Sequence, residues 1–408
     1  MEAPLRPAPL TGIVVLDLGQ IYQGPYAGLL LAKAGARVIK VEPPGGEPLR
    51  AREAVGGGAS LPLAMLNSNK EAISLNLKSP KGAELFRALA RKSDVVLENF
   101  ALGVMDRLGV GAAVLMAENP RLIYASATGF GLSGPERDTL AMDITIQAAS
   151  GAISVTGFPD GPPVKAGPAI ADFLSGTHLY AAIATALFER ERTGRGGLVE
   201  VAMIETMFPT LASNLGMIHN HPERPLARTG NRHGGLAVAP YNVYPCQDGW
   251  FALICLNELH WASLLKAMGR EDLKGDPRFA TNAARVERMA ETDALVEVWA
   301  AGRTRAEVFA AASLLRIPCS PVRDLHEVLA NDHLRVRGML EEIDHPSLGR
   351  MTAPASPLRF HGARRAPAQP SRSIGADNAA ILEEFLGIPE TETDALAAQG
   401  AVFAPPAR

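Results

Sequence analysis

A strand, a helix and a second strand follow one another between residues 12 and 42. Residues 12–18 and 36–42 are rich in valine, isoleucine and leucine, and residues 25–34 form a run of small and apolar side chains that begins with proline and ends before Gly35. A crossover of this length normally makes the two strands that it joins parallel. The pattern therefore predicts an α/β domain with a mostly parallel, Rossmann-like sheet.

The same alternation continues along the chain. We expect further strands at residues 73–77, 94–98, 122–127 and 198–202, and helices at residues 79–91 and 173–190. Beyond about residue 222 a loop rich in arginine and proline leads to a strand pair within residues 239–256 and to helices through residue 312. That second pattern is typical of a smaller α+β domain.

The last part of the chain is expected to return to the large domain. A helix is predicted at residues 325–339, and a proline-rich stretch at residues 353–370 is interpreted as a linker. We therefore expect a large first segment at 1–220, a small α+β domain at 221–325, and a linker with a return segment at 326–408.

Charge and cysteine content exclude several classes of protein. The net charge of -3 leaves no broad basic surface for a nucleic acid, so an anionic ligand must be held by a few local cations. The three cysteines form no CxxC pair, which argues against a disulfide framework or a zinc knuckle and favours a reducing cytoplasm. We expect no signal peptide, because the first residues lack its apolar core, and no membrane span, because no apolar run approaches about 18 residues.

Residues 129–134 spell GxGxxG directly after a predicted strand. A phosphate-binding turn of this kind needs a helix that begins at its glycines, so that the helix N-terminus faces the phosphates. The residues that follow, Pro-Glu-Arg-Asp, are polar and show no helical period. We therefore interpret the segment as a plain loop and expect no bound dinucleotide.

Asp172 stands directly before the long apolar helix pattern, and two interpretations remain open. Aspartate is a preferred N-cap residue, so Asp172 can simply begin the helix. A helix N-terminus also keeps a carboxylate ionised, and an ionised, partly desolvated aspartate can act as a covalent nucleophile. His178 lies six residues further on, around the helix, and is a poor candidate for a base acting on Asp172. His219 and His221 lack further ligands at metal spacing, so no metal site is expected.

Several short motifs together resemble the family III CoA-transferases, a family that includes formyl-CoA transferase, carnitine CoA-transferase and alpha-methylacyl-CoA racemase. The likeness covers nearly the whole chain in order and spacing. The motifs are Asp17-Leu18, residues 38–42 (VIKVE), residues 67–70 (NSNK), residues 75–78 (LNLK), residues 98–100 (ENF), Ala171-Asp172 and residues 193–196 (TGRG).

This resemblance implies a fold, an assembly and a reaction. The fold is a Rossmann-like large domain built from both chain ends with a small domain between them, in a homodimer whose subunits interlock. Asp172 matches the nucleophilic aspartate that attacks an acyl-CoA thioester, forms a mixed anhydride and then an aspartyl-CoA thioester, and passes CoA to a carboxylic acid. Coenzyme A is a substrate, and no permanently bound cofactor or metal is expected.

The resemblance also assigns site residues. Asp143 and Gln23 are expected to support the active site. The expected CoA contacts are Ile21, Tyr22, Leu75, Asn76, Lys78, Asn99, Phe100 and Arg107. For Lys78 and Arg107 the residue type itself fits, because the phosphates of CoA bind point or fork cations; a solvated surface charge is the alternative. For Asp143 the alternative is a cap of the helix that follows it.

The sequence departs from the family at three places. Met142 stands where the racemases carry a histidine, so transfer is favoured over α-proton exchange, which needs two proton-carrying groups. Pro43 replaces an arginine that contacts CoA, and Arg50 is a candidate replacement. The shielding glycine loop is not evident, and residues 232–235 are only a candidate for it.

The substrates remain open. Arg232 is a candidate partner for a second carboxylate on the acceptor, with a plain loop charge as the alternative, and succinyl-CoA is a possible donor. An acyl-CoA racemase and a non-catalytic CoA-binding protein remain the alternative functions.

Overall fold

The computed structural model describes residues 5–51, 61–223 and 226–403. These residues form two compact units. Unit 1 takes in the chain up to Ile146, Pro168–Met207 and the part from Asp332 onward, and unit 2 consists of Gln147–Gly167 and Phe208–Asn331. The predicted domain boundaries at residues 220, 221, 325 and 326 stay a prediction.

Unit 1 is built on a six-stranded parallel sheet with strand order β3-β2-β1-β4-β5-β6. In this order the chain runs outward from β1 to one edge and then returns to build the other half, as in Rossmann-like sheets. The predicted α/β architecture is therefore confirmed. The strands are β1 (Val14–Asp17), β2 (Arg37–Glu42), β3 (Glu71–Ser74), β4 (Val95–Glu98), β5 (Ile123–Thr128) and β6 (Leu198–Ala202).

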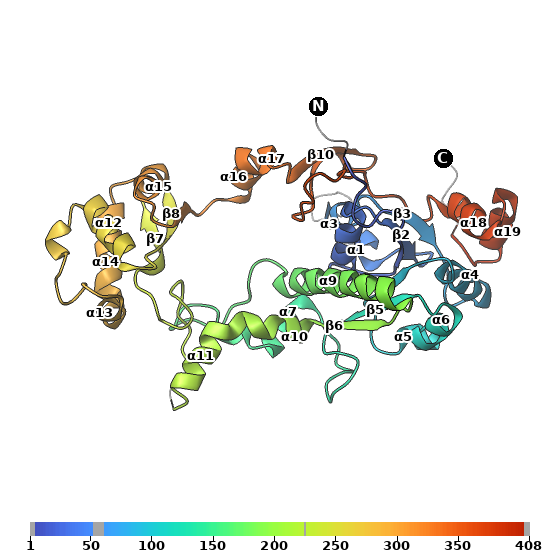
Figure 1. Cartoon of the computed structure of the whole chain (residues 1–408), viewed down its shortest axis with the longest axis horizontal. Coiled ribbons are helices and arrows are strands. Elements are labelled where there is room, and N and C mark those ends of the chain that lie inside the picture. The colour runs from blue at the N-terminus through green and yellow to red at the C-terminus, as the bar shows by residue number, and fades with distance from the viewer. Residues whose placement is uncertain (1–4, 52–60, 224–225, 404–408) are drawn as a thin grey trace. The chain divides into compact units, whose positions relative to one another are not determined.

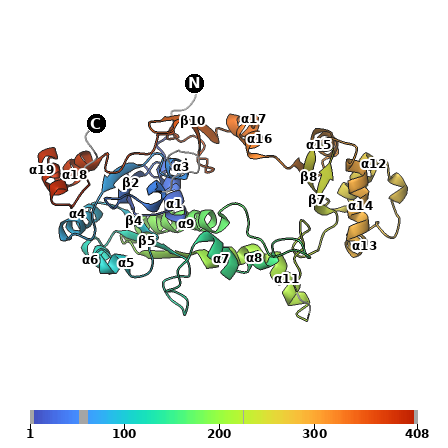
Figure 2. The same cartoon turned by 180° about the vertical axis from the view of Figure 1, so that it is seen from behind.

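Helices cover both faces of the sheet. On one face α1 (Gln23–Lys33) and α9 (Ile170–Thr193) pack on β1, β4 and β5, and Figure 1 shows the two helices side by side. On the other face lie α4 (Pro80–Ala90), α6 (Ala112–Glu118), α18 (Asn378–Leu386) and α19 (Glu390–Ala398), as the view from behind in Figure 2 also shows. Short helices follow the strands: α2 (Pro48–Ala51), α3 (Leu61–Leu66), α5 (Val104–Arg107), α7 (Asp143–Ala149) and α10 (Met203–Met207).

Unit 2 has an antiparallel sheet of its own. Its strands, in the order β7-β8-β9, are β7 (Tyr241–Cys246), β8 (Gly249–Ile254) and β9 (Cys319–Pro321), and a tight turn at residues 247–248 joins the first two. The core packs α12 (Glu258–Met268), α14 (Met289–Ala300) and α15 (Arg305–Leu314) on this sheet. The other helices are α8 (Ala152–Val155), η1 (Phe208–Leu211), α11 (Ala212–Asn220), η2 (Glu271–Leu273), α13 (Asn282–Glu287) and α16 (Leu325–Leu329).

One prediction for the last part of the chain is wrong. The single helix expected at residues 325–339 is two short helices, α16 and α17 (Asp332–Val336), because Asp324 caps the first and the chain breaks between them. The proline-rich stretch at residues 353–370 begins inside a hairpin of β10 (Leu340–His345) and β11 (Gly349–Pro354). The three acidic residues of β10 hid the alternation that marks a strand.

Among the described residues, α9 is the one helix long and apolar enough to cross a membrane. This differs from the expectation that no run approaches that length. The helix packs through Leu179, Ile183 and Leu187 into the core of unit 1, and a core helix passes the same test of length and composition.

Buried charges lie under the turn that joins β1 to α1. The Lys70 ammonium lies 2.7 Å from the Asp17 carboxylate, and both side chains are fully buried. Lys70 also donates to the carbonyl of Pro25 and to the side chain of Asn67. Only glycine fits at residue 28, because a Cβ there would lie 2.3 Å from Asp17 Oδ2. Several motif residues that carried the family resemblance thus form one buried polar cluster.

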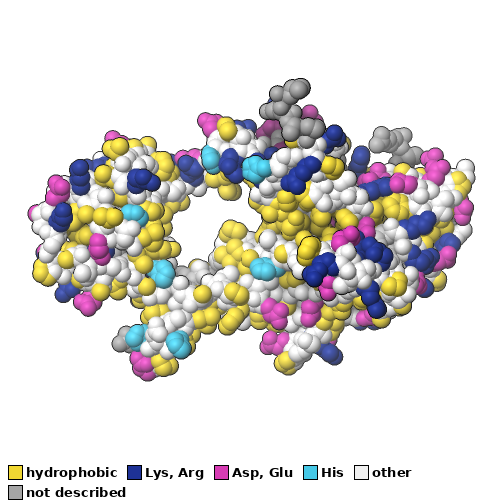
Figure 3. Space-filling view, viewed as in Figure 1, with side chains coloured by type: hydrophobic (Ala, Val, Ile, Leu, Met, Phe, Trp, Pro, Cys, Tyr) yellow, Lys and Arg dark blue, Asp and Glu magenta, His cyan; other side chains and the backbone are white. Residues whose placement is uncertain are grey.

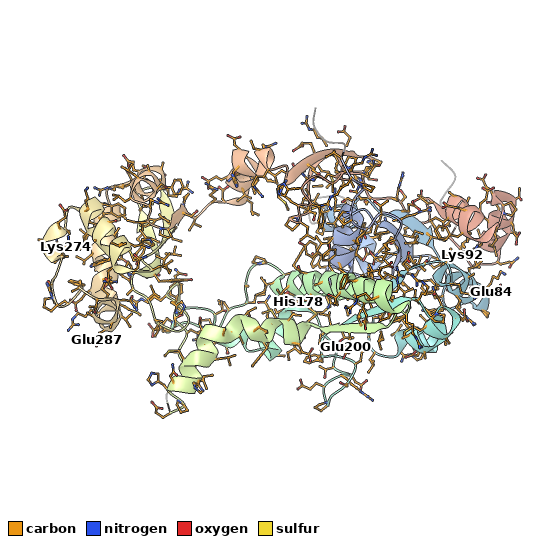
Figure 4. The ribbon with its side chains drawn as sticks, viewed as in Figure 1. Glu84, Lys92, His178, Glu200, Lys274 and Glu287 are labelled. Carbon is orange, nitrogen blue, oxygen red and sulfur yellow. The ribbon has the colours of Figure 1, made fainter. Side chains whose placement is uncertain are left out.

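Loss of the Lys70 charge should destabilise the protein strongly. Lys70→Met leaves the Asp17 carboxylate buried without its cation, which costs about 3–5 kcal/mol of unfolding free energy in such pairs. Denaturant unfolding followed by circular dichroism measures the change. The matched control is Lys81→Met, whose exposed partner Glu84 is labelled in Figure 4, and this variant should unfold like the unmodified protein. Equal losses in the two variants would contradict the assignment.

Candidate active site

A cleft of about 360 Å³ lies at the carboxyl end of the sheet in unit 1. Its walls come from the segments that directly follow β1, β4, β5 and β6, and from the first turn of α9. Ligands of open parallel sheets bind at this edge. The polar side chains among the lining residues are Gln20, Gln23, Asn99, Thr128, Arg137, Asp138, Thr139 and Asp172.

Asp172 lies inside the first turn of α9 and is only 8% exposed. The helix begins at Ile170 and its N-cap residue is Ala169, so the hypothesis that Asp172 caps the helix is wrong. The Asp172 carboxylate is buried and lies near the charge of Asp143. No group among the described residues donates a hydrogen bond to it. Its oxygens are therefore available to a bound substrate.

The cap of α9 comes from a different helix. Asp143 is the first residue of α7, and its Oδ1 accepts the backbone N–H of Ala171 at 2.9 Å and that of Asp172 at 3.3 Å. Asp143 therefore occupies the helix N-terminus, where a negative charge is stabilised. Asp143 therefore caps α9, and the same carboxylate lies near Asp172.

The Asp172 carboxyl is hard to ionise. Burial, with a further contribution from the nearby charge of Asp143, raises the pKa of Asp172 to about 7. The expectation that the helix N-terminus keeps Asp172 ionised is therefore wrong, because Asp143 accepts the N–H groups that would have stabilised its charge. Near neutral pH the side chain exchanges readily between the acid and the carboxylate. Groups with a pKa near the working pH are typical of active sites.

Gln23 brings an amide to the same cleft. It is the first residue of α1, is 3% exposed, and its Nε2 has no acceptor among the described residues. A buried donor without a partner is rare in folded proteins. The backbone of α1 comes close to α9 here, since a Cβ on Gly176 would lie 2.7 Å from the Gln23 carbonyl oxygen. Gln23 and Asp172 are thus held on two helices in direct contact.

The rest of the β1–α1 turn is fixed by Asn99. Its Oδ1 accepts the N–H of Gln20 at 2.7 Å, and its Nδ2 donates to the Gln20 carbonyl at 3.0 Å. Ile21, Asn99 and Phe100 line the cleft with Asp172. Tyr22 is not among the lining residues; its ring stacks on that of Phe173, with centroids 5.9 Å apart.

The other expected CoA contacts lie at the same edge of the sheet but outside the lining of this cleft. Leu75 is buried in the core, and Asn76 donates its side-chain amide to the Gly400 carbonyl. Lys78 follows β3 and Arg107 ends α5, and both are exposed. Figure 3 shows Lys and Arg side chains gathered over the part of unit 1 that holds α4 and α6. Two of the arginines there, Arg87 and Arg91, pair with Glu118.

Arg137 was missed in the sequence and lines the cleft. It belongs to the loop after β5, which forms neither helix nor strand, so the interpretation of the GxGxxG segment as a plain loop is confirmed. Its Nε lies 3.5 Å from an Asp138 oxygen, and both side chains are exposed. Its place a few residues after the end of a predicted strand could have indicated that this cation lies at the edge of the sheet where ligands bind.

Two arginines considered for substrate binding already have carboxylate partners. Arg50 donates to both oxygens of Glu42, at 2.6 and 2.7 Å, so its guanidinium is occupied next to Pro43. Arg232 belongs to unit 2, where its guanidinium lies 2.8 Å from Asp293. Asp293 also accepts the hydroxyl proton of Tyr244 at 2.7 Å.

Histidines do not contribute to the cleft. His178 Nδ1 lies 2.8 Å from the Leu174 carbonyl oxygen on the exposed side of α9, where Figure 4 labels it. Across the described residues, no group of three or more histidine, cysteine or acidic side chains is placed to hold a metal ion.

Residues 10–378 match the model of CoA-transferase family III. The chain belongs to this family. The acetyl-CoA:oxalate CoA-transferase of Acetobacter aceti is 36% identical over 389 residues, which are 94% of this chain and 97% of the relative. The succinate–glutarate CoA-transferase of Agrobacterium fabrum is 34% identical over 407 residues, 96% of this chain and 99% of the relative.

A solved structure agrees with the fold. The CAIB/BAIF family protein from Brucella suis has a TM-score of 0.81 and 34% identity, and the match covers 93% of this chain and 100% of that one. This protein is thus a CoA-transferase of family III with an α/β fold, and CoA thioesters are its substrates.

The residue at position 142 bears on whether this family III CoA-transferase can exchange an α-proton. Met142, where the racemases of the family are expected to carry a histidine, lines the cleft beside Asp172. A thioether carries no exchangeable proton, so this side chain cannot add or remove one. The cleft therefore lacks a proton-carrying group at the place that α-proton exchange would use.

The raised pKa of Asp172 predicts a pH-dependent cost in stability. The folded protein holds the Asp172 proton up to about pH 7, whereas an aspartate in the unfolded chain loses it near pH 4. Asp172→Asn avoids this cost, so the variant should be more stable by about 1–3 kcal/mol at pH 8.5 and equal at pH 4. Urea unfolding at both pH values measures the gap, and a gap that widens as the pH falls would contradict the assignment.

Proposed function

We propose that the protein transfers CoA from an acyl-CoA thioester to a small carboxylic acid through a covalent intermediate on Asp172. The observation that carries the proposal is a pair of groups in one cleft that have no partner among the residues the structure describes: the Asp172 carboxylate, which accepts no hydrogen bond, and the buried amide Gln23 Nε2, which donates none. A nucleophile and a donor for the developing oxyanion are the two groups that acyl transfer requires.

The donor half of the reaction has two steps. An Asp172 oxygen attacks the thioester carbon, the new C–O bond forms, the C–S bond breaks, and CoA leaves as the thiolate. The thiolate then attacks the Asp172 carbonyl carbon of the mixed anhydride, and the donor acid leaves as a carboxylate. The aspartyl-CoA thioester remains. The Gln23 amide is expected to donate to the carbonyl oxygen that becomes negative at each attack.

The acceptor half runs the same steps in reverse. The acceptor carboxylate attacks the aspartyl thioester and expels the CoA thiolate, which then attacks the acceptor carbonyl of the new anhydride. The Asp172 carboxylate and the new acyl-CoA result. Every bond that forms replaces one of similar reactivity, so these reaction steps need no bound cofactor. Met142 argues against α-proton exchange as the activity, because exchange requires a second proton carrier.

We propose that the acceptor is a short dicarboxylic acid. The names of the two relatives above pair CoA with oxalate and with succinate and glutarate. Arg137 supplies a positive charge at the cleft for such an anion. Arg232 stays a prediction for the second carboxylate, and succinyl-CoA stays a candidate donor. Lys78 and Arg107 are proposed to bind the CoA phosphates. The rest of the CoA molecule is proposed to contact Ile21, Tyr22, Leu75, Asn76, Asn99 and Phe100.

We further propose that the protein works as a homodimer in the cytoplasm. Large apolar side chains are exposed on unit 1, among them Leu140 at 81% and Phe188 at 67%. Such exposure favours a partner surface over solvent.

Removal of the nucleophile should abolish transfer. Asp172→Ala is expected to lower kcat by at least about 10³-fold, because the variant lacks the carboxylate proposed to form the anhydride. The assay supplies acetyl-CoA or succinyl-CoA with oxalate, succinate or glutarate and follows the new thioester by chromatography. In the unmodified protein, borohydride added during turnover should reduce the thioester, and peptide mass spectrometry should locate the change at Asp172. Full activity of Asp172→Ala would refute the mechanism.

The pH profile of the same reaction should report the Asp172 carboxyl. Only the carboxylate attacks, so kcat/KM for the acyl-CoA should rise with pH and level off above about 7, the pKa of Asp172. Asp143→Asn keeps an oxygen for the α9 cap but removes the neighbouring charge, so the midpoint should move to lower pH. A rate that falls between pH 5 and pH 7, or a midpoint that Asp143→Asn raises, would contradict this assignment.

A further inference from the structure

The turn that carries Gln23 into the cleft contains a residue in an unfavourable conformation. Ile21 has a φ of 64°, in the left-handed region that β-branched side chains avoid. Both Ile21 and Gln23 line the cleft with Asp172. A backbone held in this region persists only where the surrounding structure fixes it.

Glu47 is the group that fixes it. Its Oε2 accepts the backbone N–H of Ile21 at 3.0 Å, and the side chain is 1% exposed. Its Oε1 accepts from Asn67 Nδ2 at 3.1 Å and lies 3.5 Å from Lys40 Nζ. Lys40 in turn donates to the carbonyl of Gly19, at the start of the same turn. The carboxylate therefore holds the turn directly at one end and through Lys40 at the other.

Glu47 is itself held by the loop that follows β2. Its backbone N–H donates to Glu42 Oε2 at 3.0 Å, and Arg50 binds both oxygens of the same Glu42 carboxylate. Neither Glu42, Glu47 nor Arg50 lines the cleft. These groups therefore contact the turn and not a ligand in the cleft.

We propose that Glu47 is a positioning residue for CoA transfer. By keeping Ile21 left-handed, it sets the start of α1 so that the buried Gln23 amide lies at the cleft, ready for the oxyanion formed when Asp172 attacks. This inference rests on the proposed function, because it assigns Glu47 to the step in which Gln23 donates.

Glu47→Gln tests the assignment. The glutamine amide offers one acceptor oxygen where two donors, the Ile21 N–H and Asn67 Nδ2, face the side chain, so one contact is lost. We expect kcat to fall about 10–30-fold while KM for the acyl-CoA changes less than about threefold, since donation to the oxyanion matters only in the transition state.

A matched control separates positioning from general stability. Asn67→Ala removes another member of the same buried cluster, the donor to Glu47 Oε1 and an acceptor for Lys70, but leaves the contact with Ile21. This variant should lower the melting temperature and keep kcat within about threefold. A loss of kcat equal to that of Glu47→Gln would overturn the proposal.

A second background tests whether the effect passes through Ile21. Glycine adopts the left-handed conformation freely, so in Ile21→Gly the turn no longer depends on Glu47. The kcat loss caused by Glu47→Gln should shrink to below about threefold in this background. An equal loss in both backgrounds would overturn the proposal.

Hydrogen exchange gives a readout that needs no activity. The Ile21 N–H, protected by Glu47 in the unmodified protein, should exchange at least about tenfold faster in Glu47→Gln and unchanged in Asn67→Ala. Where Glu47→Gln does not fold, Glu47→Asp replaces it, because the shorter side chain withdraws from Ile21. Unchanged exchange overturns the positioning role. If the unmodified protein transfers no CoA between any of the tested acids, the proposed function fails, while the exchange result still decides whether Glu47 holds the turn.

Discussion

The Lys70 ammonium and the Asp17 carboxylate lie 2.7 Å apart in a region closed to solvent. Burial lowers the pKa of Lys70, and the Asp17 charge opposes that shift. Asp17 ends β1 and also accepts the N–H of Gly19 through its second oxygen. The pair therefore joins β1, the turn after it and the start of α1 into one rigid segment. Every group of the cleft that comes from the β1 side is placed by this segment.

A second constraint comes from the two carboxylates at the start of α9. One helix N-terminus can stabilise one negative charge well, and Asp143 occupies it. Asp172 is left buried, close to a like charge and without donors, which raises its pKa to about 7. A carboxylate that is costly to ionise gains more by forming a neutral anhydride or thioester bond than a well-solvated one does. The arrangement is thus compatible with the covalent role proposed for Asp172.

The sequence revealed the strands of unit 1 because buried parallel strands are nearly continuous runs of valine, isoleucine and leucine. The β10–β11 hairpin was not predicted because Glu341, on the same face as the buried Ile343, interrupts the alternation of β10; its charge pairs with Lys33. Asp172 was recognisable from its place before an apolar helix, but its protonation was predicted wrongly. Burial and the approach of Asp143 arise only when α7 meets α9. Glu47 gave no signal at all, since its partners Ile21, Lys40 and Asn67 are distant in sequence and each looks ordinary alone.

The turn after β3 is closed by the far end of the chain. Asn76 donates its backbone N–H to the Ala401 carbonyl and its side-chain amide to Gly400, and Leu75 pairs with Val402. Residues near 76 therefore gain their final partners only after synthesis has passed residue 402. The β1–α1 turn and α9 can form earlier, while this edge of the sheet is still incomplete. Completion of the β3 side of unit 1 therefore depends on contacts between residues 324 positions apart in the chain.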